Sequence, residues 1–286
     1  MSLLAEVKCP ICQACSKSAG TKQEYEFYRC LSCAHLFVSP MPSSLNIYGE
    51  NYFQGATEGF GYADYDADKL PMVPTFEIYL DLLERYGKLR GNLLDVGAAT
   101  GFFLELASKR NWQVHGIEAS EFAVAQARSK GLDVRGLKDA RFADESFAAV
   151  TMWDVLEHMQ DPLQELRDIH DLLQQGGLLA ISTPDAGSLV ALLAGMNWHL
   201  VVPPEHLNLF TQKSLKVALE SSGYEVLLIS RIGKRFTLQY VLQTLHRVVP
   251  LAFIMNTAKW LRGSRIGNVK IPINLHDNMT CIARKR

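Results

Sequence analysis

Apolar and polar positions alternate with two different periods through the last two thirds of the chain. Short apolar runs predict strands over 91–96, 112–118, 132–136, 146–153, 177–184 and 224–232. Segments with apolar residues three or four positions apart predict helices over 101–110, 120–131, 161–177 and 211–223. Strands that alternate with helices in this way predict an α/β fold with a mostly parallel sheet covered by helices on both faces.

Local signals at the helix ends support this division. Ser120 is placed as an N-cap, Gly131 as a C-terminal stop, and Pro162 falls in the first turn of its helix. Residues 74–87 also have helical spacing and stop at Gly87. These helices alternate with the predicted strands along the chain.

The first part of the chain is distinguished by its cysteines. Two C-x-x-C pairs, with seventeen residues between them, are formed by Cys9, Cys12, Cys30 and Cys33. Paired C-x-x-C knuckles suit tetrahedral coordination of Zn²⁺, and four thiolates leave no open position for catalysis. Residues 1–38 are therefore predicted as a zinc ribbon with a structural metal and a strand over 24–30. His35 and Cys15 are alternative ligands.

An aromatic connector is expected to follow the ribbon over residues 39–90, which also include the helix at 74–87. It carries tyrosines at positions 48, 52, 62 and 65, with Tyr79 just beyond the loop. Long loops of this kind often serve as lids or binding segments. Packing of the tyrosines against the following domain is the equally open alternative.

Composition narrows the class of protein. The chain has 286 residues, 48% of them hydrophobic, 21% charged, and a net charge of −1. This predicts a large domain with a smaller appendage and no general affinity for nucleic acid or anionic membranes. No apolar run is long enough to predict a membrane-spanning helix, and the first residues do not resemble a signal peptide, so a cytoplasmic location is expected.

The segment LLDVGAATG at 93–101 predicts a ligand-binding turn after a strand. A nicotinamide-binding turn requires G-x-G-x-x-G, whereas Gly97 and Gly101 are spaced G-x-x-x-G, with Ala99 between them. Asp95 would repel a pyrophosphate and suits a cationic ligand. Glu118 ends the next strand and is placed to accept hydrogen bonds from both ribose hydroxyls, which does not distinguish the two cofactors.

Several motifs together resemble class I S-adenosylmethionine-dependent methyltransferases. LLDVGAATGFFLELA and VHGIEAS resemble the first two motifs of that superfamily, SFAAVTMWDVLEHMQDP its fourth-strand segment and GGLLAISTP its fifth strand. Ala148 stands where the superfamily often has an acid. The resemblance implies a Rossmann-like seven-stranded sheet within residues 91–286, with 277–286 as a final antiparallel strand.

The same resemblance implies a cofactor site at the C-terminal edge of the sheet. Asp95, Gly97, Ala98 and Gly101 would surround the methionine part of S-adenosylmethionine. Glu118 and Ala119 would bind the ribose, Asp139 the adenine amino group, and Trp153 with Asp154 the methyl end. A surface position is the alternative for Asp139.

A general base is needed only where the methyl acceptor must lose a proton. His158, in VLEHMQDP, and His206, in PPEHLNLFT, both follow predicted strands. The four-cysteine module, the tyrosine-rich connector and the pair Glu205–His206 resemble the zinc-containing sugar methyltransferases, which carry a further C-terminal domain that this chain lacks. That resemblance implies that Glu205 orients or deprotonates His206, and that Trp198 and His199 line the same pocket. For His158, catalysis and packing both remain open.

A basic insertion is predicted over residues 232–276. It contains no Asp or Glu, and its basic residues are Lys234, Arg235, Arg247, Lys259, Arg262, Arg265 and Lys270. Residues 235–263 of this insertion have helical apolar spacing, which is interrupted at Pro250. It is interpreted as a cap that attracts a phosphate-bearing substrate, as a surface for a membrane or partner, or as an oligomer contact.

These observations predict an S-adenosylmethionine-dependent methyltransferase of small molecules such as nucleotide sugars, glycans or secondary-metabolism intermediates. RNA methylation through the ribbon is an alternative. Residues 1–40 contain only Lys8, Lys17, Lys22 and Arg29 as basic residues, without the dense patch that nucleic acid requires. A non-catalytic cofactor-binding module is the remaining alternative.

Overall fold

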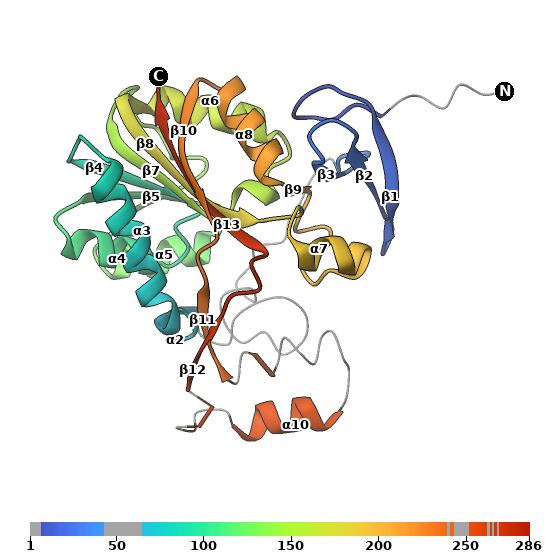
Figure 1. The fold of residues 1–286 in the computed structure, drawn as a ribbon. Coiled ribbons are helices and arrows are strands. Elements are labelled where there is room, and N and C mark those ends of the chain that lie inside the picture. The colour runs from blue at the N-terminus through green and yellow to red at the C-terminus, as the bar shows by residue number, and fades with distance from the viewer. Residues whose placement is uncertain are drawn as a thin grey trace.

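A seven-stranded sheet with helices on both faces forms the centre of the molecule (Figure 1). The computed structural model describes residues 7–42, 65–238, 241–242, 252–261, 264, 266–267 and 269–286. A small N-terminal sheet lies on one side of the large sheet. A two-stranded ribbon with a helix extends from the edge of the large sheet.

The order of the central sheet is β10-β13-β8-β7-β4-β5-β6. Its strands are β4 (Asn92–Val96), β5 (Gln113–Glu118), β6 (Asp133–Gly136), β7 (Phe147–Trp153), β8 (Leu173–Pro184), β10 (Tyr224–Ser230) and β13 (Asn278–Lys285). β4 to β8 pair in parallel, and β13 pairs antiparallel with both β8 and β10. This confirms the predicted Rossmann-like, mostly parallel sheet with its antiparallel final strand.

Helices cover the two faces of this sheet in two groups. The helical elements are α2 (Tyr65–Lys69), η1 (Leu70–Met72), α3 (Val73–Tyr86), α4 (Phe102–Lys109), α5 (Glu121–Ser129), η2 (Leu156–His158), α6 (Pro162–Leu172), α7 (Leu189–Ala194), η3 (Gly195–Asn197), α8 (Gln212–Ser221) and α10 (Ala252–Trp260). Leu93 of β4 packs with Leu104 of α4 and Val124 of α5, whereas Leu94 packs with Leu166 of α6. The side chains of successive residues in the strand thus point to opposite faces of the sheet.

The predicted helix ends agree with the structure except after α6. The side chain of Ser120 accepts a hydrogen bond from the backbone N of Ala123, and Gly131 has φ +81°. The helix predicted over 161–177 ends at Leu172, however, and residues 173–176 belong to β8. Leu173 is fully buried opposite Phe147, so strand pairing determines its conformation more than helical spacing does.

The N-terminal sheet includes a strand from a distant part of the chain. β1 (Ser16–Lys22), β2 (Tyr25–Cys30) and β3 (Leu36–Val38) are joined by β9 (Asn208–Leu209) in the order β1-β2-β3-β9. Phe27 and Leu36 share an apolar core with Trp198 and Leu209. The cysteine-bearing segment is therefore built onto the loop that precedes α8.

The insertion begins with a strand where helical spacing was predicted and ends with a strand where no element was predicted. β11 (Lys234–Thr237) and β12 (Lys270–Ile273) form an antiparallel ribbon, and α10 lies between them in sequence. Arg247, Arg262 and Arg265 lie outside the described residues, as do Tyr48, Tyr52 and Tyr62 of the connector. The three interpretations of the insertion therefore stay predictions. Within the described ranges, no helix has the length and apolarity needed to span a membrane.

Candidate active site and cysteine cluster

The turn between β4 and α4 requires two of its glycines. Gly97 and Gly101 have φ values of +76° and +81°. A Cβ on Gly97 would lie 2.5 Å from Val155 Cγ2, and one on Gly101 would lie 2.3 Å from Leu132 Cδ1. Ala99 has φ +49°, a left-handed conformation that is unfavourable for L-residues with a side chain. Both glycines of G-x-x-x-G are therefore fixed by conformation and by space, while Ala99 carries local strain.

Glu118 ties this turn to the end of β5. Its buried carboxylate accepts hydrogen bonds from the backbone N of Ala99 (2.8 Å) and of Ser120 (2.9 Å). Burial raises the pKa of Glu118, and these backbone donors oppose that rise. A carboxylate has about four acceptor positions. Glu118 thus retains capacity for the hydroxyl groups that it was predicted to bind.

Asp95 is a buried acid directly before the turn. Burial raises its pKa to about 8, while a 2.5 Å hydrogen bond from Thr151 Oγ1 opposes the shift and the charge of Glu118 adds to it. A nearby cation would favour the ionised form of this carboxyl group, and a pyrophosphate would disfavour it further. The environment of Asp95 is therefore suited to a positively charged ligand.

A pocket opens beside Asp95 at the C-terminal edge of the parallel strands. It is lined by Tyr65, Lys69, Met72, Phe76, Tyr79, Asp95, Gly97, Ala98, Phe102, Phe103, Trp153, Asp154 and Ser182. Trp153 stacks on Tyr79 with ring centroids 4.3 Å apart and contacts Phe103 edge-on at 5.2 Å. The pocket thus has an aromatic wall made by α3, α4 and the end of β7.

The structure brings together part of the predicted cofactor set. Asp95, Gly97, Ala98, Trp153 and Asp154 line the pocket, and Gly101 and Glu118 shape its loop. Ala119 lies exposed after β5. Asp139 lies exposed after β6, outside the residues that line the pocket. Tyr65 of α2 and Tyr79 of α3, for which ligand binding and packing were both left open, also line the pocket. Phe76 of α3 was missed, because helical spacing in 74–87 identifies a buried face and not the ligand beside it.

Helix α2 is attached to the turn by a second set of contacts that the sequence did not reveal. Thr100 Oγ1 donates a 2.5 Å hydrogen bond to Asp66 Oδ1, and Lys130 Nζ forms an ion pair with the other oxygen of Asp66. Lys130 also lies 3.1 Å from Glu105 Oε2. These contacts hold the end of the connector over the cofactor pocket.

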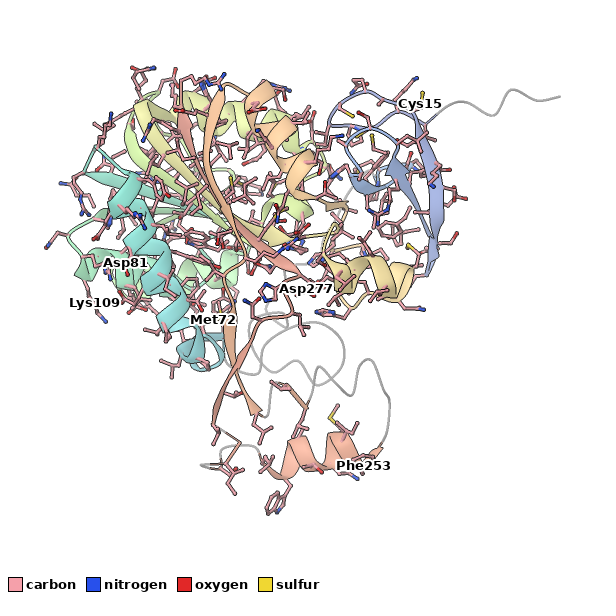
Figure 2. The ribbon with its side chains drawn as sticks, in the orientation of Figure 1. Cys15, Met72, Asp81, Lys109, Phe253 and Asp277 are labelled. Atoms are coloured by element: carbon pink, nitrogen blue, oxygen red, sulfur yellow. The ribbon has the colours of Figure 1, made fainter. Side chains whose placement is uncertain are left out.

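Asp154, which was predicted to face the methyl end of the cofactor, lies where β7, β8 and β13 meet. Asp154 follows β7 with φ +57°, and its Oδ1 accepts hydrogen bonds from Ser182 Oγ (2.9 Å) and Asn278 Nδ2 (3.3 Å). Asp277, which precedes β13, lies between the sheet and α7 (Figure 2). It accepts a hydrogen bond from Trp198 Nε1 (3.1 Å) and lies 3.7 Å from His199 Nε2.

Trp198 and His199 were both expected to line the acceptor pocket. Trp198 is only 1% exposed and belongs to the apolar core beneath the N-terminal sheet. His199 is partly exposed, and burial lowers its pKa. Of the two, His199 is the residue placed to meet a ligand.

His158 and His206 lie next to each other. Their ring centroids are 4.9 Å apart at an angle of 66°. His158 Nδ1 donates to the carbonyl oxygen of Glu205 (2.8 Å), and His206 Nδ1 donates to that of Leu200 (2.7 Å). A carbonyl oxygen only accepts, so each neutral ring carries its proton on Nδ1 and a lone pair on Nε2. Burial lowers the pKa of His158, which favours that neutral state.

A third residue, Glu157, completes this cluster. One ligand atom from each of Glu157, His158 and His206 lies within 4.8 Å of the others. Glu157 is fully buried and accepts a hydrogen bond from Thr183 Oγ1 (2.9 Å). A carboxylate beside two imidazoles can hold a proton or a divalent cation. Glu157 was missed because it precedes His158 in a motif where only the histidine was weighed. The role of Glu205 toward His206 stays a prediction, and the main-chain oxygen of Glu205 accepts a hydrogen bond from His158.

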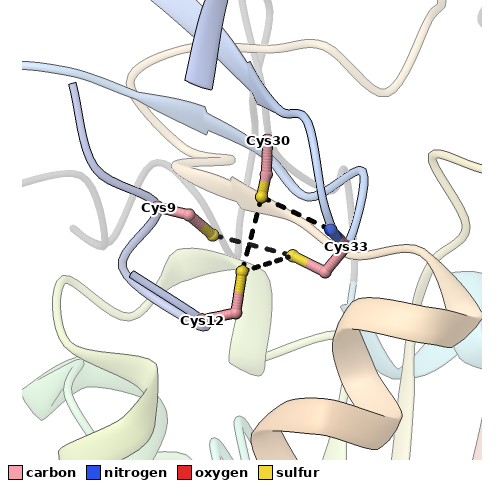
Figure 3. A group of neighbouring side chains, drawn as sticks. All are labelled: Cys9, Cys12, Cys30 and Cys33. Atoms are coloured by element: carbon pink, nitrogen blue, oxygen red, sulfur yellow. Dashed lines mark hydrogen bonds between the residues drawn. The ribbon is translucent and has the colours of Figure 1, made fainter. Parts of the chain in front are cut away.

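The four paired cysteines converge at one end of the N-terminal sheet (Figure 3). Cys9 and Cys33 have their Sγ atoms 3.6 Å apart, and Cys12 Sγ lies 3.4 Å from Cys30 and 3.5 Å from Cys33. Tetrahedral Zn–S bonds of 2.3 Å place sulfur atoms about 3.8 Å apart, so the arrangement fits zinc. The hydrogen bond between the side chains of Cys9 and Cys33 lowers the pKa of the Cys9 thiol to about 5, which favours a thiolate at Cys9.

The two alternative ligands lie outside this cluster. His35 is fully buried and its Nε2 lies 3.0 Å from Asn208 Oδ1. Cys15 Sγ lies 3.4 Å from Lys8 Nζ. The structure therefore assigns the cluster to Cys9, Cys12, Cys30 and Cys33 and gives His35 a different set of contacts.

Known proteins resemble part of this chain in sequence. The ubiquinone biosynthesis O-methyltransferase of Pseudomonas paraeruginosa is 34% identical over 109 residues, which are 35% of this chain and 47% of that protein. The protein of the same name from Xanthomonas campestris is 30% identical over 161 residues, 51% of this chain and 66% of its own. The chain spans about half the length of the first of these relatives.

Solved structures share the fold, and a family model covers most of the sheet. YcgJ from Bacillus subtilis matches with a TM-score of 0.52 and 15% identity over 75% of this chain and 99% of its own. The PH0226 protein from Pyrococcus horikoshii matches with a TM-score of 0.51 and 13% identity over 77% and 94%. The model of the methyltransferase domain matches residues 74–229, more than half of the chain. The protein therefore belongs to the methyltransferase domain family.

Proposed function

We propose that the protein is an S-adenosylmethionine-dependent methyltransferase that acts on a small molecule. The observation that carries this proposal is the buried carboxyl group of Asp95 beside a turn with two glycines at positive φ. S-adenosylmethionine supplies an electrophilic methyl group on a cationic sulfur. Asp95 and the Gly97–Gly101 turn fit its charged methionine part, Glu118 fits the ribose hydroxyls, and Trp153 and Asp154 fit the methyl end.

The aromatic wall supports the same proposal. Trp153, Tyr79 and Phe103 exclude water from the edge of the sheet where the reaction would occur. Apolar walls strengthen the electrostatic interaction of a cation with Asp95. A methyltransferase otherwise needs mainly to align donor and acceptor, and these rigid side chains provide such alignment.

The acceptor is proposed to carry a hydroxyl group. The sequence relatives are named as O-methyltransferases, and a hydroxyl acceptor must lose its proton during transfer. We assign to His206, which lies beside His158 and Glu157, the role of taking that proton on Nε2. Nucleotide sugars, glycans and secondary-metabolism intermediates are the acceptor classes that we would test first.

The cysteine cluster is proposed to bind a structural zinc ion. Its four sulfur atoms converge without a further ligand position, and all six cysteines of the chain are free thiols. Such a site suits a reducing compartment such as the cytoplasm. RNA binding by this module is less well supported, because Lys22 donates to the carbonyl of Trp198 and Arg29 to those of Ala34 and Ala186.

Isothermal titration calorimetry tests the cofactor assignment directly. The protein should bind S-adenosylmethionine and S-adenosylhomocysteine with one site per chain and should not bind NAD. Binding of NAD without binding of either adenosyl compound would reject the proposal. Release of S-adenosylhomocysteine from a panel of hydroxylated acceptors would then identify the substrate class.

The affinity for S-adenosylmethionine should increase with pH between 6 and 8. Asp95 has its pKa raised to about 8 without ligand, so most molecules hold a neutral carboxyl group at pH 6. The cationic ligand favours the ionised form, which gives up to about a tenfold gain in affinity per pH unit below the pKa and a plateau above it. Titrations in two buffers of different ionisation enthalpy should detect the released proton. Asp95→Asn should bind more weakly at pH 8 and lose this pH dependence; a wild-type affinity that is constant over the range would contradict the role of Asp95.

A further inference from the structure

The loop that carries His206 is held by the cysteine-bearing module. Leu36 and Phe37 of β3 pair with Leu209 and Asn208 of β9, two to three residues after His206. Val38 N also donates to the carbonyl of Leu207 (3.0 Å). On its other side, Leu207 N donates to the carbonyl of Glu157 (2.9 Å). The backbone of β9 therefore lies between the module and the η2 turn that carries His158.

The cysteine knuckle itself reaches the start of α8. Thr211 Oγ1 donates to the carbonyl of Cys33 (2.9 Å), and Lys213 Nζ donates to that of Ser32 (2.5 Å). Thr211 is the N-cap of α8 and follows β9 by two residues. The position of Cys33 is thus linked to the C-terminal end of the same loop.

A buried chain of polar groups links these elements through His35. Its Nε2 donates to Asn208 Oδ1 (3.0 Å), and Asn208 Nδ2 donates to the carbonyl of Met159 (2.6 Å). Ser214 Oγ lies 3.5 Å from the other ring nitrogen of His35. An amide oxygen only accepts hydrogen bonds, so His35 carries a proton on Nε2 and donates it to Asn208. Asn208 therefore joins β3 to the residue that follows His158.

This polar chain lies among apolar side chains. His35 is stacked on Phe37 with centroids 5.8 Å apart and contacts Phe210 at 4.7 Å. Buried polar groups cost free energy unless every partner is present, and a complete set specifies one arrangement of the surrounding elements. The two side chains of His35 and Asn208 thus fix register between three segments that are distant in sequence.

We propose that His35 and Asn208 are positioning residues that hold His158 and His206 together, so that the cysteine module is a structural part of the acceptor site. This inference rests on the proposed function, because it takes the two histidines as the groups that meet the acceptor. The module acts on the two histidines through β9 and η2. Loss of its metal should therefore disturb the histidine pair before it disturbs the cofactor pocket.

The test compares the double variant His35→Phe/Asn208→Leu with the control Asn92→Leu. The double variant replaces both partners with apolar groups of similar size, which limits the loss of stability. Asn92 Nδ2 donates to the carbonyl of Ser146 (3.1 Å), a matched asparagine–carbonyl contact at the opposite edge of the sheet. Both variants and the wild type are examined for zinc content, affinity for S-adenosylmethionine and imidazole nitrogen spectra by NMR.

The double variant should keep its zinc and its affinity for the cofactor. It should lose the NMR signals that report a proton on Nδ1 of His158 and of His206. The control should keep all of them. The NMR midpoint of His158 in the double variant should move up toward that of an ordinary histidine as the ring becomes more exposed. Unchanged histidine signals in the double variant would overturn the inference.

Other outcomes are separated by the remaining measurements. Should the double variant fail to fold, the single variant His35→Phe, which retains the aromatic packing, gives the same comparison with one bond removed. If wild-type protein does not bind S-adenosylmethionine, the proposed function fails, while the histidine spectra still decide whether His35 and Asn208 position the pair.

Discussion

Replacing His206 by alanine should lower the rate of methyl transfer by about 10²–10⁴-fold, the usual contribution of a general base. His206 is held by the carbonyl of Leu200, and its ring lies against that of His158. The substitution removes the proton acceptor proposed for a hydroxyl substrate. It does not alter the Gly97–Gly101 turn or Asp95. The rate should be measured by release of S-adenosylhomocysteine with saturating donor and the acceptor found by screening.

Glu118→Ala provides the opposite control. It removes the acceptor for the backbone N–H groups of Ala99 and Ser120 and the group proposed to bind ribose. Hydrogen bonds to a charged group contribute about 1.5–3 kcal/mol each, so the affinity for S-adenosylmethionine should fall by about tenfold or more. His206→Ala should leave this affinity unchanged. Equal losses of affinity in the two variants would contradict the separate roles assigned to the two residues.

The parts of the site that could be predicted from sequence are those built from adjacent residues. The turn at 97–101, the acid at 95 and the two C-x-x-C pairs each fall within a few positions. Their geometry follows from local constraints such as positive φ at Gly97 and Gly101. The seven strands were likewise predicted, because strand and helix alternate and the family resemblance supplied the last strand, whereas the full order of the strands was not.

The contacts that were missed join residues far apart in the chain. His35 and Asn208 are 173 positions apart, and Lys130 and Asp66 are 64 apart. A buried histidine beside a cysteine knuckle resembles a metal ligand in sequence, and only the fold shows that its partner is an asparagine in β9. Similarly, β9 has only two residues, which is too few to produce a recognisable alternation of apolar and polar positions. Its pairing with β3 depends on the tertiary arrangement.

Strand pairing also explains the errors at element boundaries. Residues 173–176 continue a helical spacing, but Leu173 is buried and pairs with Phe147 of β7, and pairing with β7 resumes at Leu178 after an irregularity. In the insertion, residues 235–237 have helical spacing and form β11 because β12 is available as a partner. In both places a local preference was overridden by hydrogen bonds to a segment that the spacing does not reveal.

Cys33→Ala should remove the metal and unfold the N-terminal sheet. Structural zinc contributes about 10 kcal/mol or more to folding in small modules, and a three-cysteine site loses most of that free energy. Residues 7–38 have a small core that depends on Leu209 and Trp198 for its apolar contacts. The variant should therefore contain little zinc by elemental analysis, and its N-terminal sheet should become sensitive to proteolysis.

The control for this substitution is Cys15→Ala. Cys15 is partly buried in the same module, but its sulfur contacts Lys8 and lies outside the four-sulfur cluster. Cys15→Ala should retain the zinc and the thermal unfolding temperature of the wild type. Because β3 pairs with β9, the loss in Cys33→Ala should extend to the loop at 205–209 and reduce methyl transfer while the turn at 97–101 still binds cofactor. A Cys33→Ala protein with full zinc content would contradict the assignment of Cys33 as a ligand. A variant that loses zinc but keeps a protease-resistant N-terminal sheet would show that the metal does not stabilise the module.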